Sequence, residues 1–241
     1  MMTVRHLLAA FLLVVSALVA PMQAQSERSI QFRALCLQYQ NDVRSGRVPS
    51  GKGGSGEVEF FTGGFGELHQ GTFKDNTAVF YVEDSSAPDG KRIIASGKLA
   101  EGNVQLFLLV PDGEKDRAYR IQCFADDVAH FPMGGVRFLN LTSFPARLEL
   151  AGTTLKPVNP GTAQVYPMVT KADEWNMYQV RLELQAPTGQ WATISSPSWK
   201  ALKTKRDFVV ITIDPKSKRP KIFSFKDLPP WLENPESAGN P

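Results

Sequence analysis

The chain has 241 residues, of which 42% are hydrophobic and 21% charged, and its formal net charge is +3. This composition is that of a folded globular protein and excludes extended disorder. The 17 prolines and 19 glycines argue against a helical bundle. The near-neutral charge argues against a dedicated nucleic-acid binder, which needs a concentrated positive field.

Residues 1–24 have the pattern of a secretory signal peptide. Arg5 and His6 precede an apolar run at 7–20, and the small residue Ala24 stands at the expected cleavage point. A membrane span needs about 20 apolar residues, so this run is too short to be one. We therefore expect an exported protein, periplasmic or secreted, with no transmembrane anchor in its mature part.

Export also changes what is expected of the only two cysteines, Cys36 and Cys123. Both lie in alternating rows that predict inward-pointing side chains, and an oxidising compartment favours disulfides. The sequence therefore favours a Cys36–Cys123 disulfide. The alternative is two buried free thiols that pack as small hydrophobic groups.

From residue 56 onward, the hydrophobic residues recur with the period of two that is typical of β-strands. The clearest run is 178–185, where polar and apolar residues alternate strictly. An earlier stretch at 34–44 fits a helix, but it fits a strand that starts at Ile30 better. Pro- and Gly-containing turns separate about a dozen such runs. We therefore predict an all-β fold, an antiparallel β-sandwich.

A dozen strands exceed the seven to nine of one simple sandwich, which indicates two packed β domains. The pattern breaks at 125–135, so we place an N-terminal β domain at 27–128 and a C-terminal β-sandwich at 129–232. One enlarged sandwich is the alternative. The polar segment 233–241 is predicted to be a disordered tail.

The chain offers few groups for catalysis or metal binding. No pair of histidines or cysteines has a zinc-ligand spacing, and no G-x-S-x-G nucleophile elbow occurs. Asp126, Asp127 and His130 form the one acid–base candidate, although acids in such a turn usually cap backbone N–H groups. We expect a non-catalytic protein with no cofactor and no metal.

Three tryptophans, Trp175, Trp191 and Trp199, fall within 25 residues. Aromatic side chains exposed on a β-sandwich can stack on the C–H faces of sugar rings. Trp191 and Trp199 are therefore candidates for a carbohydrate site, and core packing is the alternative reading.

Basic residues concentrate between residues 200 and 221, where eight lysines and arginines face two aspartates. Such a basic hairpin could bind an anionic envelope polymer or a membrane surface, with Lys200, Arg206, Lys218 and Arg219 as candidate contacts. The alternative is that these lysines protect an exposed sheet edge from aggregation.

A motif in the second half is familiar. The segment 131–142 reads F-P-M-G-G-V-R-F-L-N-L-T, and a Pro160-Gly161 turn and a Trp199…Arg206-Asp207-Phe208-Val209 strand follow it. This order resembles exported bacterial β-sandwich proteins of unknown role that carry F-P-x-G-x-x-R-F-x-N-L-T. The resemblance covers about the last hundred residues and implies an envelope or secreted domain, without catalytic residues.

These observations predict a non-catalytic, exported accessory or interaction protein of the cell envelope. A module that binds carbohydrate or an anionic envelope polymer is the alternative. Its partner would be an envelope protein or polysaccharide, and not a nucleic acid.

Overall fold

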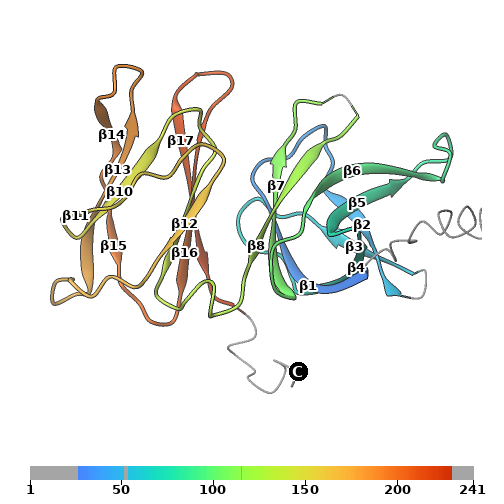
Figure 1. Cartoon of the computed structure of the whole chain (residues 1–241), viewed down its shortest axis with the longest axis horizontal. Helices are drawn as coiled ribbons and strands as arrows, with labels where there is room; N and C mark the ends of the chain where they lie inside the picture. The colour runs from blue at the N-terminus through green and yellow to red at the C-terminus, as the bar shows by residue number, and fades with distance from the viewer. Residues whose placement is uncertain (1–26, 52–53, 115, 230–241) are drawn as a thin grey trace, which may run out of the picture.

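The computed structural model describes residues 27–51, 54–114 and 116–229, and every regular element among them is a β-strand. The all-β prediction is confirmed. The predicted signal peptide, the predicted tail and Trp231 lie outside the described residues. The described strands form three sheets in two halves, strands β1–β8 and strands β9–β17 (Figure 1).

The N-terminal half is one eight-stranded sheet in the order β3-β2-β5-β6-β8-β7-β1-β4. The sheet curls so that β4 also contacts β2, β3 and β5, and it encloses a first apolar core that includes Phe32, Phe80 and Phe107. Its strands are β1 (Glu27–Cys36), β2 (Ser45–Pro49), β3 (Ser55–Glu59), β4 (His69–Lys74), β5 (Thr77–Glu83), β6 (Lys91–Lys98), β7 (Val104–Pro111) and β8 (Tyr119–Ala125).

The C-terminal half is a sandwich of two sheets. One has the order β12-β9-β16-β17, and the other has the order β11-β10-β13-β14, with β15 paired to β13. A second apolar core lies between them. The strands are β9 (Val136–Asn140), β10 (Ala146–Leu150), β11 (Thr153–Thr154), β12 (Ala163–Tyr166), β13 (Met177–Gln185), β14 (Trp191–Ser195), β15 (Ser198–Lys200), β16 (Arg206–Ile213) and β17 (Pro220–Asp227).

The sheets differ from the prediction in one respect, because they are not purely antiparallel. Strand β1 is parallel to β7, β6 to β8, and β9 to β16. Turn signals in the sequence reveal hairpins between consecutive strands. They carry no information on which distant strands become neighbours, so the sequence could not predict these parallel pairs.

A third apolar core joins the two halves. The outer faces of β1 and β7 pack against β9, β16 and β17, with Leu35, Leu108, Phe208 and Phe225 among the buried contacts. Segment 126–135 links β8 to β9 at this seam. Since the two halves share a core, the division into two domains stays a prediction.

Cys36 and Cys123 are both free thiols, so the predicted disulfide is wrong. Strand β7 lies between them, because Cys36 pairs with Leu109 and Cys123 with Phe107. Two strand spacings are about 10 Å. The Cα atoms of a disulfide must lie within about 7 Å. Both thiols face the first core, as the alternation indicated, but they lie on strands that β7 holds apart.

Candidate functional site

The two tryptophans of the predicted carbohydrate site do not share a surface. Trp191 pairs with Gln185 at one end of β13, and Trp199 pairs with Tyr178 near the other end. These positions are seven residues apart along β13, a distance of about 23 Å. The fold therefore provides two separate tryptophan environments.

Each of these tryptophans already has a partner. The guanidinium carbon of Arg147 lies 4.1 Å from the centroid of the Trp191 ring. Arg147 Nε also donates a hydrogen bond to Glu183 Oε2 at 2.6 Å. Trp199 is half-buried against the second core and meets Tyr178 edge to face, with ring centroids 6.4 Å apart. A sugar ring would have to displace Arg147 to stack on that face of Trp191.

The predicted basic hairpin is divided between the two ends of the sandwich. Arg206 pairs with Asp227 at one end of β16, whereas Ile213 pairs with Pro220 at the other end, beside Lys218 and Arg219. Lys200 ends β15 at the same end as Arg206. Lys218 and Arg219 thus lie far from Lys200.

Arg206 is completely buried and belongs to an internal ion network, which we define as Arg33, Asp126, Arg206 and Asp227. Arg206 Nη2 donates to Asp126 Oδ1 at 2.8 Å, and Nε donates to Asp227 Oδ2 at 2.8 Å. Its Nη1 donates to the carbonyl oxygens of Asp126 and Phe131. These bonds fix the turn between β8 and β9, so Arg206 acts within the fold.

Arg33 connects the network to the N-terminal half. Its Nη2 donates to Asp126 Oδ2 and its Nη1 to Asp227 Oδ1, both at 2.7 Å. All four charged side chains are at most 2% exposed. Buried charges require such pairing because an uncompensated ion loses its hydration. The sequence does not reveal this network, because its members lie 93 to 194 residues from Arg33.

The familiar motif of residues 131–142 builds the same seam. The Phe131 ring contacts two cations, with guanidinium carbons of Arg137 and Arg206 at 4.3 and 4.4 Å from its centroid. Asn140 is buried and donates from Nδ2 to the carbonyls of Phe144 and Val158. The motif residues therefore hold turns and sheets together.

Arg137 is the exception in this well-paired region. It is 3% exposed, and its Nη2 donates to the Ala125 carbonyl at 2.6 Å, but its Nη1 has no hydrogen-bond partner among the described residues. Burial lowers the pKa of Arg137 to about 10, against the attraction of Asp126. Arg137 is thus a buried cation with one hydrogen bond to a carbonyl group, and it lies over the rings of Phe124 and Phe131.

The acid–base candidate does not assemble. Asp126 turns into the ion network, whereas Asp127 accepts from the backbone N–H of His130 at 3.0 Å and lies 2.8 Å from His130 Nδ1. This arrangement caps a turn. Within the described ranges, no group of three His, Cys, Asp or Glu residues could hold a metal ion.

One end of the C-terminal sandwich carries what remains of the predicted basic hairpin. We define the basic turn as Lys216, Lys218, Arg219 and Lys221, which are all exposed. Asp214 orders this turn by accepting backbone N–H bonds from Ser217 at 2.7 Å and Lys216 at 3.0 Å. The Ser217 bonds lower the pKa of Asp214. The turn therefore holds four cations beside one carboxylate, and backbone N–H groups already bind that carboxylate.

The opposite end carries Trp175, which is 70% exposed, the highest fraction of any large hydrophobic side chain among the described residues. The loop that presents it is ordered by Asp173, whose Oδ1 accepts the N–H of Trp175 at 2.9 Å and of Met177 at 2.7 Å. Asn176 turns the chain with a φ of 59°. The sequence singled out Trp175 only as a member of the tryptophan group.

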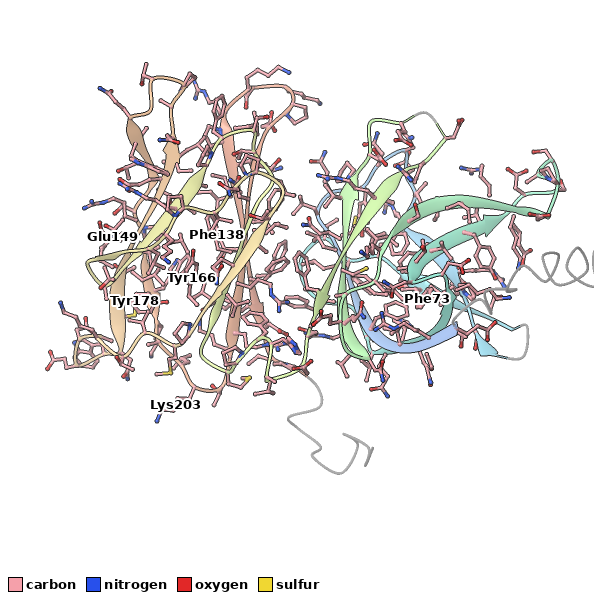
Figure 2. The ribbon with its side chains drawn as sticks, viewed as in Figure 1. Phe73, Phe138, Glu149, Tyr166, Tyr178 and Lys203 are labelled. Carbon is pink, nitrogen blue, oxygen red and sulfur yellow. The ribbon has the colours of Figure 1, made fainter. Side chains whose placement is uncertain are left out.

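A second loop lies beside this one. The N–H of Ala201 donates to the carbonyl of Asn176 at 2.8 Å, which places Leu202 and Trp175 on neighbouring segments. Leu202 is 36% exposed, and Lys200 and Lys203 are exposed. Lys203 projects from this end of the molecule (Figure 2). We call residues 171–176 and 200–204 the Trp175 end.

Comparison of the chain with protein-family models finds no match, and a search of curated proteins finds none either. No helix long and apolar enough to cross a membrane occurs in the part of the chain that the structure describes.

Proposed function

We propose that this protein is a non-catalytic, exported interaction protein of the cell envelope, and that it contacts its partner through the Trp175 end. The observation that carries the proposal is Trp175 itself, which is largely exposed on a loop held by Asp173. Export is supported by the signal-peptide pattern of residues 1–24, and an envelope role by the resemblance of residues 131–142 to exported bacterial proteins.

An exposed tryptophan on an ordered loop is well suited to binding. Tryptophan is enriched among the residues that dominate interface energies, because its ring buries a large area. The hydrogen bonds of Asp173 order the loop in advance, so less conformational entropy is lost when a partner binds. The polar side chains around Trp175 then supply the rim of the interface.

The experiment compares Trp175→Ala with Phe61→Ala, which removes an aromatic ring of 43% exposure from the N-terminal half. We expect Trp175→Ala to weaken binding of the purified protein to native cell envelopes by about tenfold or more. Phe61→Ala should bind like the wild type, and both variants should remain folded. Equal binding of Trp175→Ala and the wild type would refute the proposal.

The basic turn supports a second candidate function, the binding of an anionic envelope polymer. Its four cations lie within six residues and are all exposed, which concentrates positive charge at one point of the surface. Lys218 and Arg219, which the sequence predicts as contacts, remain candidates for such binding. Lys200 stands at the opposite end, and the burial of Arg206 removes it from such a contact.

Retention on immobilised dextran sulfate tests this candidate. Replacing Lys216, Lys218 and Arg219 by alanine should lower the salt concentration of elution markedly, whereas alanine at Lys171, Lys200 and Lys203 should lower it less. Elution of the wild type without retention would refute polymer binding. Carbohydrate binding by Trp191 and Trp199 stays a prediction, which a glycan array would test.

A further inference from the structure

Two adjoining loops present the exposed apolar side chains of the Trp175 end, Trp175 on one and Leu202 on the other. Below these loops, Met168 and Val169 are half-buried and pack against the second core. The two loops touch, since the Ala201 N–H donates to the Asn176 carbonyl, and the second of them is held at its far side by the bond from the Gly134 N–H to the Lys205 carbonyl. The exposed apolar surface of this end therefore consists of Trp175 and Leu202.

Charged residues surround this apolar tip. Lys171, Lys200 and Lys203 are exposed, and so are Asp173 and Glu174. The carboxylate of Asp173 is bound to two backbone N–H groups, which leaves three lysines and Glu174 as the available charges. The tip thus combines a tryptophan and a leucine with a rim of slight positive charge.

We propose that the Trp175 end is a membrane-docking surface, on which Trp175 and Leu202 enter the interfacial region of a lipid bilayer. This inference rests on the proposed function and names its partner, the bilayer of the envelope. Tryptophan favours the interface between water and hydrocarbon, because its ring is apolar and its N–H stays hydrated. Lysine side chains extend from such a site toward the headgroup phosphates.

The shape of the tip favours a bilayer over a sugar. Sugar recognition needs polar groups beside the aromatic face to bond the hydroxyls. Here the adjoining segment presents Leu202, the carboxylate of Asp173 is already engaged by its own loop, and the exposed lysines suit headgroup phosphates. An exposed apolar pair on two adjoining loops instead matches shallow insertion between headgroups.

The two ends of the sandwich should respond differently to salt. Binding by the basic turn would be mainly electrostatic and would be screened at high ionic strength. Binding by the Trp175 end depends on apolar insertion, because its cations and anions nearly balance. Membrane docking should therefore persist at 0.5 M salt, when dextran sulfate binding is lost.

Flotation with vesicles of phosphatidylcholine and phosphatidylglycerol (7:3) tests the proposal with the full processed chain. We expect the wild type and Phe61→Ala to float with the vesicles, and Trp175→Ala to bind about tenfold more weakly. Trp175→Phe keeps an aromatic ring and should bind within about threefold of the wild type. Brominated lipid should quench the wild-type tryptophan fluorescence, and Trp175→Phe should lose most of this quenching.

Two outcomes would overturn docking: no flotation of the wild type, or flotation that is unaffected by Trp175→Ala. If Trp175→Ala still weakens binding to native envelopes in that case, the proposed function stands and the partner is a protein or a polymer. If neither vesicles nor envelopes distinguish the variant, both proposals fail.

Discussion

Arg33 of β1 and Asp227 of β17 are separated by 194 residues, yet they form a two-point ion pair at the seam between the two halves, with N–O distances of 2.7 and 3.1 Å. Asp126 and Arg206 close the network around them. Because these side chains are almost completely removed from water, the loss of one partner leaves an unpaired buried charge.

The first prediction compares two buried arginines at this seam. Arg33→Met leaves Asp126 and Asp227 without one of their cations and should lower the free energy of unfolding by about 3–5 kcal/mol. Arg137→Met removes a cation whose Nη1 has no partner, so its unfolding free energy should stay within about 1 kcal/mol of the wild type or rise. Urea unfolding measures both variants. Equal losses would show that the ion network has no special role.

The strands could be predicted from the sequence, but the ion network could not. The alternation of apolar residues predicted the strands, because burial on one face imposes a period of two along the chain. The ion network depends on which strands meet across the seam, as do the parallel pairs of β1 with β7 and of β9 with β16. Local spacing contains no signal for such contacts, so Arg206 resembles any other member of a basic run.

The candidate surface was visible in the sequence only in part. The tryptophan group was evident, but exposure separates its members: Trp175 projects, whereas Trp191 lies under Arg147 and Trp199 packs on Tyr178. Asp173 holds the loop that presents Trp175, and an aspartate before a turn is too common to single it out in a sequence.

The second prediction concerns alkaline pH. Burial raises the pKa of Cys36 to about 11 and that of Cys123 to about 12. Because the thiol pKa is lower in the unfolded state, rising pH ionises the unfolded state first and favours it. The stability that the protonated thiols contribute is therefore fully present below pH 9 and is lost as the pH rises through the folded-state pKa. For Cys36 this loss should reach about 2–3 kcal/mol between pH 9 and 11.

Urea unfolding at pH 8 and at pH 10.5 measures this loss. Cys36→Ala should show a smaller decrease between the two pH values than the wild type, whatever its stability at pH 8. Stability that is constant up to pH 11 would contradict the burial of these thiols. Native protein should also show no fast-reacting thiol toward Ellman's reagent, and denatured protein should show two.

The third prediction separates charge from backbone strain in the basic turn. Lys218 has a φ of 59°, a conformation that glycine adopts without strain, whereas Lys216 is not among the positive-φ residues. Lys218→Gly should therefore raise the free energy of unfolding by up to about 1 kcal/mol, and Lys216→Gly should lower it by about 0.5–1 kcal/mol. Both variants lose one charge, so both should elute earlier from dextran sulfate. Thermal unfolding that ranks the two variants the other way would contradict the role of the backbone.

The fourth prediction tests whether Asp173 orders the Trp175 loop in advance of binding. Asp173→Ala keeps the tryptophan but removes the acceptor for the N–H groups of Trp175 and Met177, so these amides should exchange hydrogen faster. Vesicle binding should weaken about three- to tenfold, because the loop must then be ordered on binding. Asp173→Asn retains an amide oxygen at the same position and should restore both the slow exchange and the binding. If exchange at Trp175 and Met177 is the same in Asp173→Ala as in the wild type, the loop is held by its backbone alone, and the order of the Trp175 end does not depend on this carboxylate.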